Sequence, residues 1–344
     1  MIEDRAAAGE IEPDVVEAVT APKGPGKSRW AVAAVLLLGL LLLPLGRPFL
    51  DSYNYTILLV TNGLMWVALA SSWNILGGYS GYISLGHAVF LGVGGYVAAV
   101  PLYYHGVSPF LTALVGGLAA VVLGLAVGLI TLRTRGPAFI ISTIALLFMF
   151  LLLVENFDYL GGTAGLPLPV VDLPQDWLKA PFFYAMLIAA VGSILLSYRV
   201  AHSKFGLGLR AIAEDETKAE VAGVPTRLYK IVAFALSAFW VGVAGAIWGY
   251  SLSFVRPSLF FTVAISAQMV LMAIIGGRGT VAGPVIGAAL IVAVNEFSLT
   301  QFGSSEINIV ISGALLVTVL LFFPLGIVGT LRAKRWLPAF LDWD

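Results

Sequence analysis

The sequence predicts an all-α integral membrane protein with about ten transmembrane helices. Three observations predict this class: the composition, the length of the apolar segments and the distribution of positive charge. Of 344 residues, 59% are hydrophobic and 11% are charged, whereas about a quarter of the residues of soluble domains are charged. The mean hydropathy is +0.96. Cysteine is absent, which excludes a disulfide framework and a thiolate metal site.

The polar N-terminal segment, residues 1–29, is acidic and rich in alanine and proline. This composition is typical of a disordered cytoplasmic tail, and the segment lacks the basic start and cleavage site of a signal peptide. It contains PKGPGKS, but Ala21 stands where a phosphate-binding loop needs its first glycine. We therefore expect its basic residues to anchor the inner membrane face. Residues 331–344 are expected to form a C-terminal cytoplasmic tail, so that residues 30–330 form the permeating domain.

A spanning helix needs about 20 apolar residues. Ten segments approach or meet this length: 30–48, 54–73, 83–103, 110–131, 138–154, 181–198, 231–254, 262–276, 282–299 and 308–329. The eighth and ninth are short and are separated by IIGGRGTVAGP, so residues 262–299 either span twice or are partly re-entrant.

Lysine and arginine set the orientation, because they are enriched in cytoplasmic loops. With the N-terminus inside, sixteen of the 19 basic residues fall on inner segments, and only Arg47, Lys179 and Arg256 fall outside. Both termini are then cytoplasmic, and the span count is even.

Two connections are long. The outer one, 155–181, is rich in glycine and proline and is expected to be a structured loop. The inner one, 199–230, contains RAIAEDETKAEVAGV, which predicts a short amphipathic helix that ends at Gly223 and Pro225. Its small residues, Ala211, Ile212, Ala219 and Val221 with Ala222, form one face, and Glu214, Asp215, Glu216 and Glu220 form the polar face. Such a helix is either a solvated loop element or a docking helix for another protein's groove.

Two glycine-rich stretches interrupt the apolar pattern, ILGGYSGYISLG and IIGGRGTVAGPVIG. A gapless alignment places Gly77 and Gly78 on Gly276 and Gly277, which indicates a weak internal repeat with broken helices at a transport pathway. Close packing between helices explains the same residues equally well. The candidates for a pathway or helix break are Gly77, Gly78, Ser80, Ser84, Gly86, His87, Gly276, Gly277, Gly283 and Pro284. For His87 itself, a hydrogen bond inside the bundle is favoured over substrate contact.

No catalytic or metal-binding pattern is present. His87, His105 and His202 lie at different membrane levels, and no nucleophile has a base near it in sequence. Glu155 and Glu296 lie only near span ends, whereas a proton-driven pump more often buries carboxylates at mid-membrane. We therefore expect no enzyme activity, no resident cofactor and an external energy source.

Four motifs occur in order over about residues 50–330: NILGGYSGYISLGHAVFLGVGGY, ENFDYLGGTAGLP, the inner-loop sequence GLGLRAIAEDETKAEVAGVPTRLYK with the span after it, and IIGGRGTVAGPVIGAAL. Together they resemble the permease subunit of branched-chain amino acid ABC importers, the LivM type, within a wider family that includes LivH and ribose-type permeases. The acidic tail is longer than the core of that family requires.

The resemblance implies that the inner loop is a coupling helix that docks on an ATPase. The docking candidates are Arg210, Glu214, Glu216, Ala219, Glu220, Ala222 and Gly223. It also implies a prokaryotic inner-membrane location and four kinds of contact: a second homologous permease, two cytoplasmic ATPases that use ATP, an extracytoplasmic substrate-binding protein and the lipid bilayer, with no nucleic acid. Urea, short amides or aromatic acids remain alternative substrates, and a stand-alone secondary transporter or channel remains an alternative class.

Overall fold

The computed structural model describes residues 27–46, 53–169 and 177–302, together with separate short stretches between 310 and 336. Most of the expected N-terminal tail, much of the expected last span 308–329 and most of residues 331–344 lie outside the described residues. The elements in chain order are α3 (Lys27–Leu42), η1 (Leu43–Leu45), α4 (Tyr53–Gly77), α5 (Ala88–His105), α6 (Pro109–Thr131), α7 (Pro137–Glu155), η3 (Asp158–Leu160), β1 (Leu166–Pro167), α8 (Ala180–Ala201), α9 (Lys204–Glu214), α10 (Glu216–Val221), α11 (Thr226–Ser251), β2 (Phe254–Val255), α12 (Pro257–Phe260), α13 (Val263–Gly277), α14 (Ala282–Phe302) and α16 (Gly326–Ala333).

The all-α membrane class is confirmed. Among the described residues, eight helical segments are long and apolar enough to cross a membrane: α4, α5, α6, α7, α8, α11, the α12–α13 segment 257–277, and α14. The first expected span, 30–48, is a shorter apolar helical segment at 30–45. The total of ten spans and the inward orientation of both termini stay predictions.

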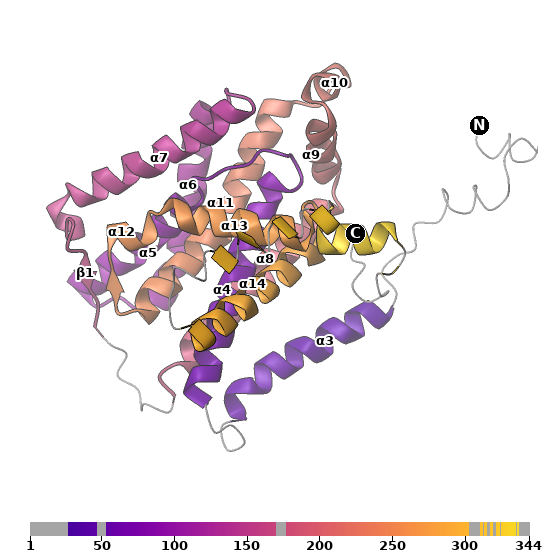
Figure 1. Ribbon diagram of the computed structural model, residues 1–344. Helices are drawn as coiled ribbons and strands as arrows, with labels where there is room; N and C mark the ends of the chain where they lie inside the picture. The colour runs from indigo at the N-terminus through magenta and orange to yellow at the C-terminus, as the bar shows by residue number, and fades with distance from the viewer. Residues whose placement is uncertain are drawn as a thin grey trace, which may run out of the picture.

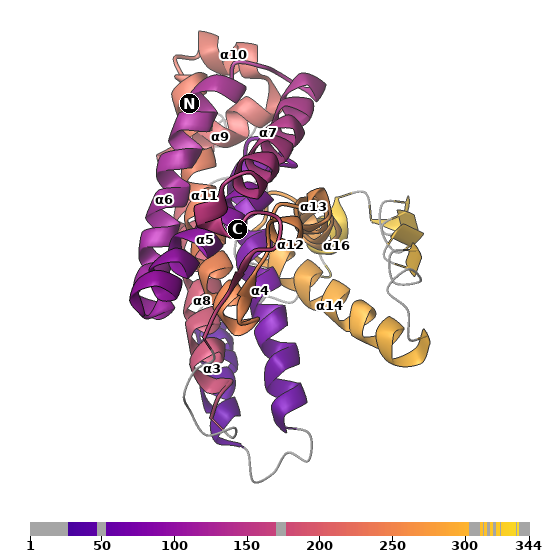
Figure 2. The ribbon, with the colours of Figure 1, turned by 90° about the vertical axis from the view of Figure 1, so that its left-hand side faces the viewer.

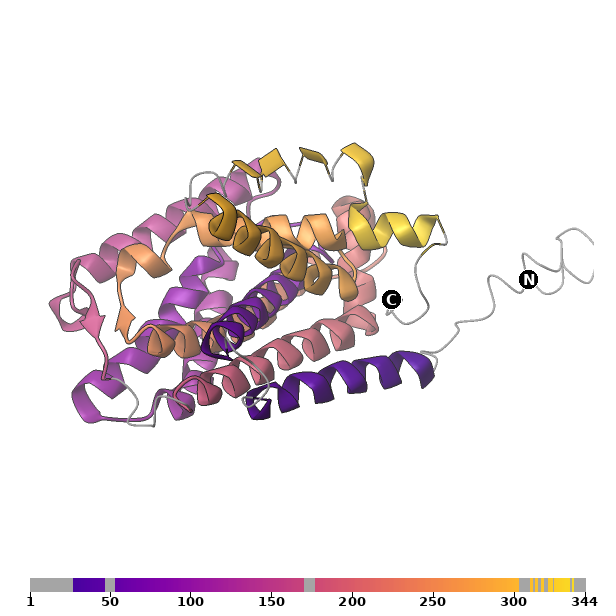
Figure 3. The ribbon, with the colours of Figure 1, turned by 60° about the horizontal axis from the view of Figure 1, so that its bottom comes forward.

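The helices form a bundle with two distinct ends (Figures 1 and 2). α9 and α10 lie at one end, called here the α10 end, and β1 lies at the other, called the ribbon end. α11 packs against α5 and α6, and α4 packs against α8. Figure 3 shows α3 running beside α8. There the rings of Trp30 and Tyr198 lie 6.0 Å apart, and the Tyr184 hydroxyl donates to the Leu41 carbonyl at 3.1 Å.

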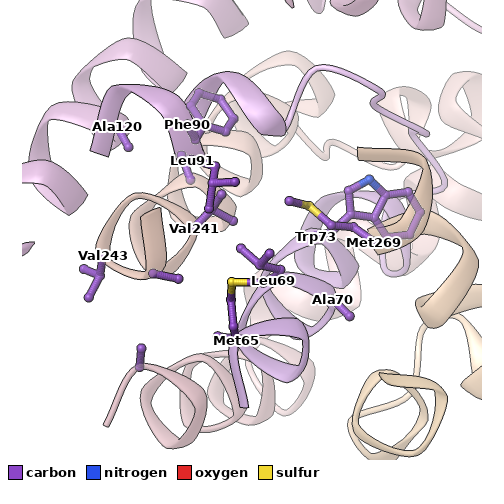
Figure 4. Packing of buried hydrophobic residues seen from close by; sticks show 14 of the residues in the cluster. Met65, Leu69, Ala70, Trp73, Phe90, Leu91, Ala120, Val241, Val243 and Met269 are labelled. Carbon is purple, nitrogen blue, oxygen red and sulfur yellow. The ribbon is translucent and has the colours of Figure 1, made fainter. Parts of the chain in front are cut away.

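Small residues bring the central helices together. A Cβ atom added at Gly94 of α5 would overlap the carbonyl oxygen of Gly242 of α11, and one added at Gly242 would lie 2.8 Å from the carbonyl oxygen of Gly116 of α6. Such close approach matters in a bilayer, where lipid competes equally for apolar surface and tight packing drives helix association. Figure 4 shows the adjoining apolar core, where Met269 of α13 lies beside Trp73 of α4.

The ribbon end contains the outer connection. β1 pairs antiparallel with β2, with Leu166 opposite Val255, and the Leu168 amide donates to the Ser253 carbonyl at 2.9 Å. The loop predicted at 155–181 is therefore structured over its described part and is attached to the end of α11, while residues 170–176 lie outside that part. This two-stranded ribbon is the only sheet in the described chain.

Candidate functional site

The predicted inner-loop helix is in fact two helices, so the expectation of one helix over 210–224 is wrong. Asp215 separates α9 from α10 with an extended backbone, φ −162° and ψ 107°. Its carboxylate accepts the Lys218 amide at 3.0 Å and so caps α10, a role that favours aspartate over helix continuation. Gly223, at φ +86°, ends the segment as the sequence predicts. The helices α9 and α10 are called here the α9–α10 segment.

The α9–α10 segment turns one face to the bundle and another outward. Leu209, Ile212 and Ala219 are buried, which places Ile212 and Ala219 of the predicted small-residue face against the protein. Val221 is 87% exposed. The other exposed members of the predicted docking set are Arg210, Glu214, Glu220, Ala222 and Gly223. The outward surface is therefore centred on the end of α10.

Glu216 points inward, although the sequence places it among the docking candidates. Its carboxylate lies 2.6 Å from the Lys230 ammonium, with side-chain exposures of 12% for Glu216 and 3% for Lys230. The Tyr82 hydroxyl donates to the same carboxylate and accepts from Lys230 at 3.0 Å. Arg135 adds a contact to Glu216 at 3.4 Å. A buried lysine is thus neutralised by a carboxylate from α10, which satisfies the requirement that buried charges be paired.

Glu220 extends this group. It accepts from Thr226 at 2.7 Å and lies 3.3 Å from Arg135. The Glu216 cluster is defined here as Tyr82, Arg135, Glu216, Glu220, Thr226 and Lys230. Burial acts to raise the pKa of Glu216, but the hydrogen bonds from Lys230 and Tyr82 and the nearby positive charges outweigh it and hold that pKa below its usual value. The carboxylate is therefore ionised at neutral pH.

The Glu216 cluster joins three separate parts of the chain. Tyr82 lies between α4 and α5, Arg135 lies in the turn between α6 and α7, and Lys230 lies in the first turns of α11. Arg210 also lies over the Tyr79 ring, 5.8 Å from its centroid. Sequence reasoning missed Tyr82, Arg135, Thr226 and Lys230, because the contacts join residues up to 148 positions apart. The intramembrane edge position of Lys230, beside an apolar span, was the one available signal.

The first glycine-rich stretch is a non-helical connection over residues 78–87, called here the first break. Its backbone is satisfied by side chains from several helices: Trp73 donates to the Ser84 carbonyl at 2.9 Å, and Thr143 accepts the Leu85 amide at 3.2 Å. Ser266 accepts the Ala88 amide at 2.9 Å just beyond it. Irregular backbone inside a membrane protein requires such cover.

The predicted candidates in the first break are packed inside protein. Ser80, Ser84 and His87 are buried. Ser80 donates to the Leu76 carbonyl at 2.7 Å, and His87 Nε2 lies 2.9 Å from the Ser237 hydroxyl. A Cβ at Gly86 would lie 2.6 Å from the Thr143 carbonyl oxygen. The hydrogen bond favoured for His87 is therefore present, whereas pathway lining stays a prediction.

The second glycine-rich stretch, residues 278–281 between α13 and α14, is called here the second break. Gly279 has φ +77°, a conformation that glycine adopts without steric cost. Gly276 and Gly283 contact each other across the break, where an added Cβ at Gly276 would overlap the Gly283 carbonyl. Pro284 stands in the first turn of α14, where it removes no helical hydrogen bond.

The two breaks are in direct contact through Asn74. Its amide nitrogen donates to the Thr280 carbonyl at 2.9 Å, and its amide oxygen accepts the Gly279 amide at 3.0 Å. Asn74 is fully buried at the end of α4, three residues before Gly77. Asn74 was quoted in the sequence motif but not predicted to have a role. The Glu216 cluster, the first break, Asn74 and the second break thus form one continuous series of contacts.

The geometry is that of a structural and mechanical site. In the described part of the chain, no group of three or more histidine or acidic side chains could hold a metal ion. The contacts instead join an exposed helical segment to the irregular backbone inside the bundle.

Comparison with known proteins agrees with this architecture. Residues 55–320 match the family described as "Branched-chain amino acid transport system / permease component". The chain is 26% identical over 328 residues to the high-affinity branched-chain amino acid transport system permease protein LivM of Escherichia coli K12, covering 87% of this chain and 76% of the relative. It is 26% identical over 295 residues to LivH of Salmonella typhimurium LT2, covering 80% of this chain and 95% of the relative. The chain therefore belongs to the family of branched-chain amino acid transport permeases, as a LivM-type member.

Proposed function

We propose that this multi-pass permease subunit couples ATP hydrolysis by cytoplasmic partners to the import of branched-chain amino acids. The family and the printed names of its relatives support the substrate class. The observation that carries the coupling role is the position of α10, whose outer surface is exposed while its Glu216 is bonded to the first break through Tyr82.

The series of contacts described above suggests how movement passes inward. An ATPase that binds around Val221 displaces α10, and the Glu216 cluster connects α10 to α11 through Lys230 and to the first break through Tyr82. Asn74 then connects α4 and the first break to the second break. Because both breaks are irregular, they can change conformation at lower cost than continuous helices.

The same reasoning assigns the orientation. The α10 end holds most of the basic residues of the described loops, among them Arg135, Arg210 and Arg227, so we place it in the cytoplasm. The ribbon end then faces outward, where a substrate-binding protein would dock. A second homologous permease, two ATPases and that binding protein complete the importer in this proposal, and the chain itself holds no cofactor.

The test is reconstitution of the tagged complex in liposomes with ATP inside and its binding protein outside. Glu220→Lys, Gly223→Trp and Val221→Glu are expected to retain membrane insertion but to lose ATPase co-purification or leucine uptake per ATP hydrolysed. Val107→Glu is the matched control, because Val107 is an exposed apolar residue at the opposite end of α5.

Two results would overturn the proposal. One is normal coupled transport by all three α10-end variants. The other is leucine transport by the purified chain without any ATPase, which would make it a stand-alone transporter. Binding of urea, short amides or aromatic acids rather than leucine by the partner receptor would change the substrate but not the coupling role.

A further inference from the structure

A cavity of about 370 Å³ lies toward the ribbon end, far along the bundle from the Glu216 cluster. It is formed by the first turns of α4, the start of α8 and the end of α11, and Glu296 of α14 lies on its wall. Most of the lining is apolar, including Leu58, Phe182 and Ile247. Its volume falls within the range of about 300–1,000 Å³ that is typical of small-molecule sites.

Two opposite charges share this cavity. Lys179 donates to the Asn54 carbonyl at 3.2 Å, and Glu296 accepts from the hydroxyl of Tyr55, the next residue of α4. Both charged groups are therefore held near the first turn of the same helix. No ion pair joins either charge to another group among the described residues. Each keeps capacity for an additional charged hydrogen bond.

An apolar-walled cavity with one fixed cation and one fixed anion is complementary to a zwitterion with an apolar side chain. A carboxylate bonds to an ammonium and an ammonium to a carboxylate through charge-assisted hydrogen bonds, which are stronger than neutral ones. Ionisable groups at membrane-spanning segments also mark substrate pathways more often than packing sites. Glu296, on a helix that is otherwise apolar up to Asn295, has no packing role that would require its charge.

We infer that this cavity is an acceptance site for a free zwitterionic amino acid with an apolar side chain. Lys179 binds the carboxylate, Glu296 binds the ammonium group, and the apolar lining receives the side chain. The inference rests on the proposed function, since it gives the released amino acid its first position in the permease. It assigns a site to residues that lie outside both glycine-rich breaks and outside the α9–α10 segment.

This arrangement predicts a sharp requirement for both charges. A ligand that lacks one of them leaves either Lys179 or Glu296 unpaired in an apolar surrounding, and such loss of a required partner discriminates strongly. 4-Methylpentanoate keeps the carboxylate and the branched chain of leucine, and 3-methylbutylamine keeps the ammonium and the chain. Both should bind much more weakly than L-leucine.

The absence of cysteine from the chain allows a direct test. Thr61→Cys places one thiol in the cavity wall with little change in shape, and Ser108→Cys is a matched control in the exposed turn between α5 and α6. The rate of maleimide labelling is measured in the purified complex, with cysteine-free partners and without the binding protein. At a leucine concentration ten times the dissociation constant, labelling of Thr61→Cys should slow about 10-fold by mass action, and labelling of Ser108→Cys should not change.

Lys179→Met and Glu296→Gln, each added to Thr61→Cys, should abolish the protection while the labelling rate without leucine and the elution of the complex stay unchanged. The inference is overturned by equal protection from either single-charge analogue, by protection that survives both variants, or by no protection at any leucine concentration. Failure of ATPase co-purification would sink the proposed function instead, because labelling protection requires no ATP and no ATPase contact.

Discussion

The pairing of Glu216 with Lys230 gives the most informative perturbation. Glu216→Leu leaves the Lys230 ammonium, whose side chain is 3% exposed, without an opposite charge. Breaking a buried ion pair from one side costs about 3–5 kcal/mol. Lys230→Met is milder, because Glu216 keeps Arg135 at 3.4 Å as a partner. Its cost should be that of one charged hydrogen bond, about 1.5–3 kcal/mol.

The double variant Glu216→Leu/Lys230→Met removes both charges together. Replacing a buried ion pair by apolar residues is often neutral or stabilising, so the double variant should be more stable than Glu216→Leu alone. We expect a coupling free energy of about 2–3 kcal/mol between the two positions. The assay is reversible unfolding of the purified chain in mixed micelles by an ionic detergent, followed by circular dichroism.

Transport separates a structural role from a coupling role. If the cluster connects α10 to the breaks, the double variant regains stability but still imports less leucine per ATP hydrolysed than the unaltered chain. Additive stability effects of the two single changes would refute the buried-pair reasoning. A double variant with normal stability and normal coupling would show that the cluster serves folding alone.

Three further predictions follow from other contacts. Asn74→Ala leaves the Gly279 amide and the Thr280 carbonyl without their partner, and should destabilise the chain by about 1–3 kcal/mol per lost bond, measured by the same unfolding assay. Gly94→Ala should cost about 1–3 kcal/mol through overpacking against Gly242, whereas Gly39→Ala, at a helix position with open space, should cost nothing; equal effects would contradict the packing. The lowered pKa of Glu216 means that its stabilising contribution is complete above its ordinary pKa of 4.5 and is lost as the pH falls below that value, so the melting temperature of Glu216→Gln should depend less on acid than that of the unaltered chain; identical acid profiles would contradict it.

The sequence predicted the class, the span boundaries and the existence of both breaks, because these depend on local apolar length and glycine content. Its single inner-loop helix failed at Asp215, where one side chain prefers to cap α10 rather than continue α9. The pattern of acidic residues did indicate a polar face, but it could not show that Glu216 turns inward.

The connections between motifs could not be predicted, because they are tertiary contacts. Tyr82 is 134 residues from Glu216, and Asn74 is 206 residues from Thr280. Within one sequence, nothing distinguishes Asn74 from other polar residues of a spanning helix. The cavity between Lys179 and Glu296 likewise arises from the packing of four helices, although both residues could be located near span ends from sequence alone.

The central claim is that the exposed end of α10 contacts the ATPase. The most direct measurement places a benzophenone photo-crosslinker on a single cysteine at Val221→Cys, with Val107→Cys as the control at the opposite end, in membranes that contain the complete importer. The account predicts an ATPase crosslink from position 221 and none from position 107. An ATPase crosslink from position 107, or none from position 221 in a complex that still hydrolyses ATP in response to substrate, would contradict it.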